Sequence, residues 1–109
     1  MNQEQGFETG QVFDMKKTVE YADGSIVSRQ LIKKDNGNIT LFAFDKGEEL
    51  SEHTSPYDAL IQVLEGEVRI TIGGKDFLLD AQQSIIMPAD IPHALFAPER
   101  MKMLLIMIR

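Results

Sequence analysis

The sequence contains no cysteine among its 109 residues. This excludes disulfides, thiolate nucleophiles, Cys-bound zinc and iron–sulfur clusters. The lack of cysteine also fits a reducing compartment, so we expect the protein to be cytoplasmic.

An excess of positive charge is also missing, because 17 acidic side chains outnumber 11 basic ones and give a net charge of −6. A surface of this sign repels phosphate backbones and anionic lipids. We therefore expect neither nucleic acid nor a membrane as a partner.

Long apolar runs are absent as well. The longest, residues 103–108, is too short to cross a bilayer. The first ten residues, MNQEQGFETG, lack the basic start and apolar stretch of a secretory signal. With 43% hydrophobic and 26% charged residues, the chain has the balance of an ordinary globular protein, and its length suits one domain.

Short apolar runs separated by turn signals fill most of the chain, which is typical of an all-β sandwich or barrel. Residues 67–72 alternate apolar and polar side chains as a half-buried strand does, and Gly73-Gly74 predicts a two-residue hairpin turn. Near the start, Asp14 could cap one or two helical turns. The predicted strands are residues 25–32, 39–44, 58–65, 67–72, 75–79, 84–87, 94–97 and 102–109.

The last predicted strand carries apolar side chains on both faces, so both faces must be shielded from water. One interpretation is that the N-terminal segment folds over the outer sheet. The other is a homodimer, which small sandwiches often need to bury such patches, and we favour it.

The chain has two histidines, His53 and His93, each beside a turn-rich stretch that contains proline. Proline fixes φ and removes a backbone donor, so both stretches are predicted to be rigid connections at strand ends. Such loops often build binding sites. A single isolated histidine is more often a structural residue, and this alternative stays open for each ring.

Two motifs in this region resemble those of the cupins. The first is Gly47-x5-His53-x-Ser55 followed by VLEGE at residues 63–67, and the second is IIMPADIPH at residues 85–93. The resemblance implies an RmlC-like jelly-roll barrel, a double-stranded β-helix with a ligand pocket between its sheets. We therefore predict one cupin barrel domain over residues 25–109, with residues 1–24 as a short helical or irregular segment packed on it.

In metal-binding cupins the first motif supplies His-x-His and a Glu, and the second supplies a third His. By this resemblance His53 and His93 hold the first and last ligand positions, whereas Ser55 and Ala59 replace the other two. The metal-binding motif is therefore degenerate. Two imidazoles with waters would hold a divalent ion such as Zn, Ni, Fe or Mn only weakly.

Nearby carboxylates do not repair this ligand set. Asp58 lies one residue out of register, and such a slip turns a strand side chain to the opposite face. Glu52, like Asp58, lies next to an inward-facing position and is more often a solvated loop charge, whereas Glu49 shares the parity of His53 but lies a turn-length away. Gln82 and Asp90 stand where the family usually has glycine, although Asp90 tolerates a positive φ.

These observations predict a pocket that contains His53, Ser55, Tyr57, Ala59 and His93. Residues 61, 63, 87, 101 and 103 are further candidates for its wall. We favour a protein that binds a small organic ligand there, with a weakly held divalent metal on the two histidines as an addition. The alternatives are a metal-dependent enzyme of the isomerase, lyase or dioxygenase type, and a structural homodimer without a ligand. The sequence leaves open whether the protein is an enzyme.

Overall fold

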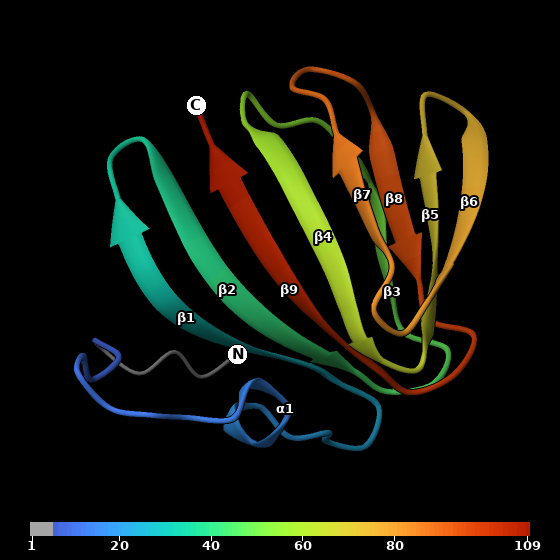
Figure 1. Ribbon diagram of the computed structural model, residues 1–109. Coiled ribbons are helices and arrows are strands. Elements are labelled where there is room, and N and C mark those ends of the chain that lie inside the picture. The colour runs from blue at the N-terminus through green and yellow to red at the C-terminus, as the bar shows by residue number, and fades with distance from the viewer. Residues whose placement is uncertain (1–5) are drawn as a thin grey trace.

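The computed structural model describes residues 6–109 and confirms an all-β jelly roll with one short helix in that part of the chain (Figure 1). All eight predicted strands are present, with ends that differ by at most two residues. Helix α1 covers Met15–Thr18, and the Asp14 side chain accepts a hydrogen bond from the Lys16 N–H as its N-cap. The strands are β1 (Ile26–Lys34), β2 (Gly37–Phe44), β3 (Glu49–His53), β4 (Asp58–Glu65), β5 (Glu67–Ile72), β6 (Lys75–Asp80), β7 (Ser84–Met87), β8 (His93–Phe96) and β9 (Met101–Ile108).

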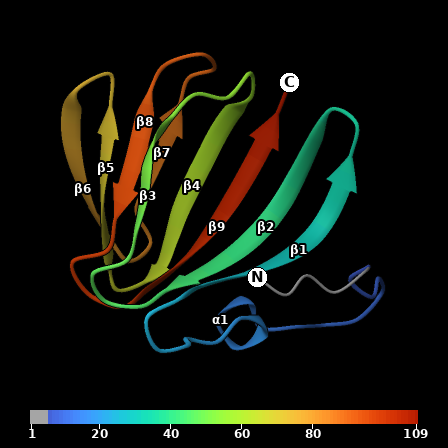
Figure 2. The ribbon, with the colours of Figure 1, turned by 180° about the vertical axis from the view of Figure 1, so that it is seen from behind.

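The strands form two antiparallel sheets that lie face to face, as Figures 1 and 2 show from opposite sides. The five-stranded sheet has the order β1-β2-β9-β4-β7, and the four-stranded sheet has the order β3-β8-β5-β6. Because side chains alternate across a strand, each sheet turns one apolar row toward the other. The core between the sheets includes the fully buried Phe44, Ile61, Val63, Val68 and Ile70.

Strand β3 is the element that the sequence did not predict. Four of its five residues are exposed, so it lacks the alternating burial that marks the other strands. It is an edge strand that pairs only with β8, where Leu50 lies opposite Leu95 and, after an irregularity in register, His53 lies opposite His93. His53 is the last residue of β3 and His93 is the first residue of β8, so each histidine lies at a strand end.

Left-handed backbone occurs where the turn signals predicted it. Gly73 and Gly74 have φ angles of 55° and 84° in the β5–β6 hairpin. Asp90 and Gln82, which stand where glycine was expected, also have positive φ angles of 65° and 73°. Glycine is required at position 66 for two reasons. Its φ angle of 76° is left-handed, and a Cβ there would collide with the Arg100 backbone.

The N-terminal segment covers part of the outer face of the five-stranded sheet. Val19 is 2% exposed and belongs to a second apolar cluster that includes Leu41, Leu64 and Leu104. The Lys102 amine, on the same face of the sheet, donates to the Lys16 carbonyl. The apolar residues of β9 are therefore covered on both sides near its beginning, and the cover on the outer side comes from the same chain.

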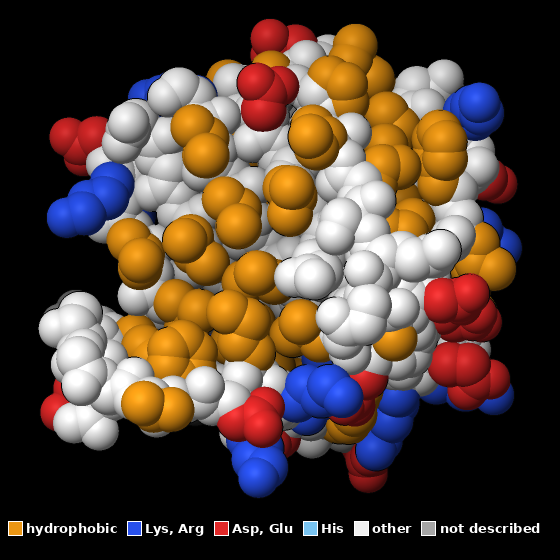
Figure 3. Space-filling view, in the orientation of Figure 1, with side chains coloured by type: hydrophobic (Ala, Val, Ile, Leu, Met, Phe, Trp, Pro, Cys, Tyr) orange, Lys and Arg blue, Asp and Glu red, His pale blue; other side chains and the backbone are white. Residues whose placement is uncertain are grey.

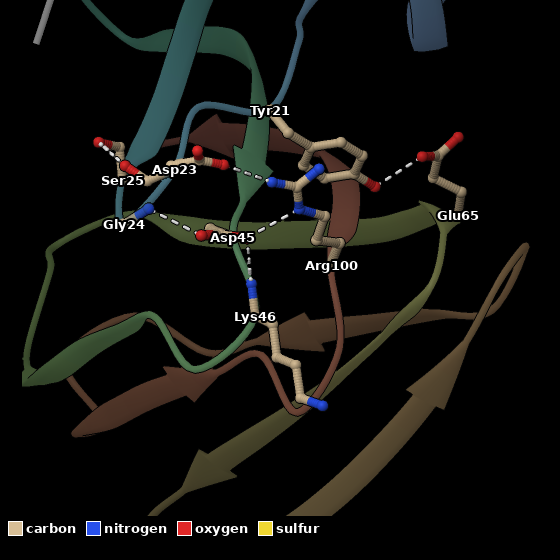
Figure 4. A network of polar contacts seen from close by, with 8 residues as sticks. All are labelled: Tyr21, Asp23, Gly24, Ser25, Asp45, Lys46, Glu65 and Arg100. Carbon is tan, nitrogen blue, oxygen red and sulfur yellow. Dashed lines mark hydrogen bonds and ion pairs between the residues drawn. The ribbon is translucent and has the colours of Figure 1, made fainter.

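A polar network fixes the end of this segment to the barrel (Figure 4). Arg100 bonds Asp45 at 2.8 Å and Asp23 at 2.9 Å, and the Gly24 N–H donates to Asp45 at 2.7 Å. The Gly24 N–H, followed by Arg100 and a further backbone N–H, lowers the pKa of Asp45 to about 2. The Asp45 carboxylate therefore joins the end of the N-terminal segment, at Gly24, to Arg100 of the barrel.

The other end of the outer face stays uncovered. Ile32, Ile86 and Ile108 are 50%, 62% and 59% exposed, and Figure 3 shows apolar side chains gathered over this sheet. Among residues 6–109, no helix has the length and apolar character needed to span a membrane.

Candidate functional site

The two histidines meet on the inner side of the four-stranded sheet. Their Cα atoms are register partners at the end of β3 and the start of β8, and their ring centroids lie 4.3 Å apart at an interplanar angle of 67°. His93 is 6% exposed, whereas His53 is exposed to solvent. Pairing between two strands thus brings together imidazoles that are separated by forty positions in the sequence.

Each ring is held by the backbone through the same nitrogen. The Nδ1 of His53 lies 2.7 Å from the Ser51 carbonyl oxygen, and the Nδ1 of His93 lies 3.2 Å from the Ile91 carbonyl oxygen. Because a carbonyl oxygen only accepts, each Nδ1 carries the proton and donates it. In the uncharged ring, Nε2 is then a bare acceptor that is left for a ligand or a metal ion.

Both rings line a cavity of about 120 Å³ between the two sheets. Ser55 adds a hydroxyl to the polar part of the wall, and His53 is the exposed residue of the lining. The rest of the wall is apolar and comes from both sheets: Phe42, Leu50, Ala59, Ile61, Met87, Leu95, Met103, Leu105 and Met107.

Four of the five residues predicted for the pocket line this cavity, namely His53, Ser55, Ala59 and His93. Tyr57 is not part of the lining, and its ring lies 5.2 Å from the Arg109 guanidinium. Its N–H donates to the Ser55 hydroxyl at 3.1 Å in a tight turn across Pro56. The turn interrupts the alternation on which the placement of Tyr57 was based.

Sequence reasoning missed several wall residues and misplaced others. Ile61, Met87 and Met103 line the cavity as expected, whereas Met101 and Val63 lie in the core without lining it. The missed residues are Leu50 and Leu95 on the strands of the histidines themselves, and Phe42, Leu105 and Met107 on the facing sheet.

The carboxylates near the histidines do not enter the cavity. Asp58 accepts a hydrogen bond from the Ala89 N–H at 2.9 Å, and the Ser55 carbonyl accepts one from the Asp90 N–H at 2.8 Å. These bonds join the β3–β4 connection and the start of β4 to the loop before β8. Glu49 and Glu52 are exposed.

A complete metal-ligand set is therefore not assembled in the described part of the chain. Residues 6–109 contain no group of three or more His, Cys, Asp or Glu side chains arranged to hold a metal ion. At the two other ligand positions that the resemblance implied, Ser55 offers a hydroxyl and Ala59 offers no donor. Among the residues that line this cavity, His53 and His93 therefore offer an ion their Nε2 atoms, and Ser55 offers its hydroxyl.

Comparisons with known proteins agree with this architecture. The family model described as "Cupin domain" matches residues 40–108. A conserved protein of unknown function from Streptococcus pyogenes is 37% identical, with a TM-score of 0.91 over 100% of this chain and 96% of that one. A cupin 2 conserved barrel domain protein from Leptotrichia buccalis is 43% identical, with a TM-score of 0.87 over 89% of this chain and 47% of that one.

A curated relative, the polyketide synthase CurC of Streptomyces cyaneus, is 34% identical over 59 residues. The match covers 53% of this chain and 38% of the relative, so the chain spans well under half of that protein.

Proposed function

Because this chain belongs to the cupin family, we propose that it binds a small organic molecule inside its barrel, with His53 and His93 at the pocket. The observation that carries the proposal is that both imidazoles line one largely apolar cavity while each ring keeps its Nε2 free. Ligand sites in proteins commonly combine an apolar wall with a few convergent polar groups.

The size of the cavity supports a small occupant. Its volume of about 120 Å³ is close to the ~150 Å³ of an engineered apolar cavity that binds benzene. A larger molecule would have to extend beyond this volume. The name of the polyketide synthase relative supports an organic molecule as the class of ligand, and we do not assign the activity of that relative to this chain.

Metal-dependent catalysis is the weaker candidate. The residues present do not fit the four-ligand cupin site, because a carboxylate and one imidazole are missing. Two imidazoles completed by water would hold Zn, Ni, Fe or Mn weakly. An isomerase, lyase or dioxygenase that depends on such an ion would lack the inward carboxylate, so we place ligand binding first.

A thermal-shift screen over sugars, hydroxy acids and aromatic compounds tests the proposal. A specific ligand raises the melting temperature by mass action, by an amount that grows with its concentration. We expect at least one class to give a saturable shift that is reduced in His53→Ala and His93→Ala. If no class shifts the wild-type protein, the cavity is not a ligand site.

Chelation and element analysis separate the two candidates. We expect treatment with a chelator to leave the ligand-dependent shift unchanged. If protein purified without a His tag contains stoichiometric metal that both His→Ala variants lose, and the ligand shift disappears with it, the metal-dependent alternative is correct.

We also propose a homodimer through the uncovered part of the five-stranded sheet. Ile86 and Ile108 are more than half exposed there, and together with Leu60 and Ile106 they line one shallow apolar groove. Burying such a patch against a second copy removes it from water. We expect Ile86→Asp to lower the mass measured by light scattering to that of a monomer.

The matched control for this experiment is Leu78→Asp. Leu78 is 59% exposed, but it lies on β6 of the other sheet, so this variant is expected to stay dimeric. A wild-type protein that is monomeric at every concentration contradicts the dimer.

A further inference from the structure

Resting on the ligand-binding function proposed above, we propose that the occupant is a neutral aromatic alcohol of the phenol class. Its hydroxyl donates to the Nε2 of His93, and its ring fills the methionine-lined cavity. The proposal combines three properties of one site: the free acceptors at its polar end, the lack of a cation there, and the nature of its apolar wall.

The polar end of the cavity offers acceptors that need a donor. The backbone carbonyl of Ile91 holds the Nδ1 proton of His93, so the Nε2 of this ring has a lone pair and no proton. His93 is 6% exposed, so a hydrogen bond to this ring is shielded from water. His53 is exposed and can reach water instead. A ligand O–H therefore stabilises the complex most at His93.

Ser55 completes the recognition of a hydroxyl group. Its Oγ accepts a hydrogen bond from the Tyr57 N–H at 3.1 Å, which leaves its own proton free to donate. A ligand hydroxyl both donates and accepts, so it matches a wall that presents imidazole acceptors and one serine donor. An ether or a hydrocarbon cannot donate to the imidazole.

Charge at the site disfavours a carboxylate. Within residues 6–109, neither lysine nor arginine lines the cavity. A carboxylate would therefore find no lysine or arginine here to offset its desolvation. The whole chain also carries a net charge of −6, which repels anions.

The wall of the cavity suits an aromatic ring. Met87 and Met107 flank Ala59 on the neighbouring strands, and Met103 lies farther along β9. Thioether sulfurs make favourable contacts with ring edges, and flexible methionines adapt to a flat occupant. The small side chain of Ala59 leaves space between the two flanking methionines. The volume of about 120 Å³ is in the range that accepts one six-membered ring.

The test is a titration of the full chain with phenol, toluene and benzoate at pH 8. Methyl-labelled methionines report binding at the cavity, and Met15, which packs in the second apolar cluster, is the internal reference. We expect phenol to bind, and benzoate to bind about a hundredfold more weakly because its charge is not paired.

Substitution of the imidazoles locates the hydrogen bond. We expect His93→Leu to lower phenol affinity about fivefold, as the loss of one hydrogen bond does, without weakening toluene. His53→Leu is the matched control, because it makes the same replacement at the solvent-exposed ring and is expected to have the smaller effect on phenol.

Nitrogen NMR of the imidazoles keeps the test decisive if His93→Leu does not fold. The chain has two histidines, so its imidazole spectrum is simple. Phenol should shift the Nε2 resonance of His93, and toluene should not. An unshifted Nε2 or benzoate binding as tight as phenol overturns the proposed ligand class, whereas the ligand-binding function stands. If none of the three compounds moves a cavity methionine, the class is overturned. The broader screen described above then decides the function separately.

Discussion

Filling the cavity is expected to stabilise the protein while it abolishes ligand binding. Ala59 is 3% exposed and lines the cavity between Met87 and Met107. In Ala59→Leu the side chain gains three carbons that point into this space. At ~0.8 kcal/mol per buried CH₂, the limit of the gain is about 2.4 kcal/mol.

The cavity volume sets a second limit. At ~24 cal/mol per Å³, an empty space of about 120 Å³ lowers the free energy of unfolding by about 3 kcal/mol. The two limits agree, and strain in the new side chain reduces the gain. We therefore expect Ala59→Leu to raise the free energy of unfolding by about 1–2 kcal/mol.

Urea unfolding followed by far-UV circular dichroism measures this change, since the chain has no tryptophan to report by fluorescence. We expect a higher midpoint with an unchanged slope, because the surface exposed on unfolding stays similar. Ligands that shift the melting temperature of the wild-type protein should leave that of the variant unchanged.

Ala97→Leu is the matched control for the same substitution. Ala97 is completely buried in the same core but does not line the cavity, so the added carbons have no space. Overpacking of this kind costs about 1–3 kcal/mol. If Ala59→Leu destabilises the protein as much as Ala97→Leu, the space beside Ala59 is not a usable cavity and the reasoning fails.

Three further predictions concern stability. Gly66→Ala should lower the urea midpoint, because the new Cβ would meet the Arg100 backbone at a φ of 76°; an unchanged midpoint would show that the turn relaxes freely. Burial and the 2.6 Å bond to Glu65 raise the pKa of Tyr21 above its usual 10.0, so the folded state favours the neutral phenol. Its contribution is complete below pH 10 and is lost as the pH rises further, so Tyr21→Phe should flatten the fall in the free energy of unfolding between pH 9 and about 12. Hydrogen bonds lower the pKa of Asp45 from 3.8 to about 2, so its contribution is present above pH 4 and lost on acidification toward pH 2. Asp45→Asn should remove that part of the acid dependence, and parallel acid curves for the two proteins would contradict this assignment.

Much of the fold was predictable because strand formation follows local patterns. The alternation in residues 67–72 and the glycines at 73 and 74 located β5, its turn and β6 within one residue. The sequence did not predict strand β3, because this strand is an exposed edge of its sheet and therefore needs no apolar face. Its existence follows from backbone pairing with β8, which depends on a partner far along the chain.

What covers the outer face of the five-stranded sheet was also only partly predictable from the sequence. The sequence established that β9 needs apolar partners on both faces. It could not decide between the N-terminal segment and a second copy, because either supplies apolar surface. In the structure Val19 covers the part near Leu104, whereas Ile108 remains 59% exposed. The N-terminal segment therefore supplies the apolar cover at one end of the sheet, and a second copy is our proposal for the other.

By itself, the sequence determined the short strands, the turns with left-handed backbone and the two histidines as the candidate centre, since these depend on residue type and spacing along one strand. Only the tertiary structure decided that the imidazoles lie 4.3 Å apart, that Tyr57 lies outside the cavity and that Phe42 and Met107 line it. The physical reason is that a local pattern specifies which face of a strand is buried. Which side chains share a cavity depends on how distant strands pair and on how the two sheets are placed over each other.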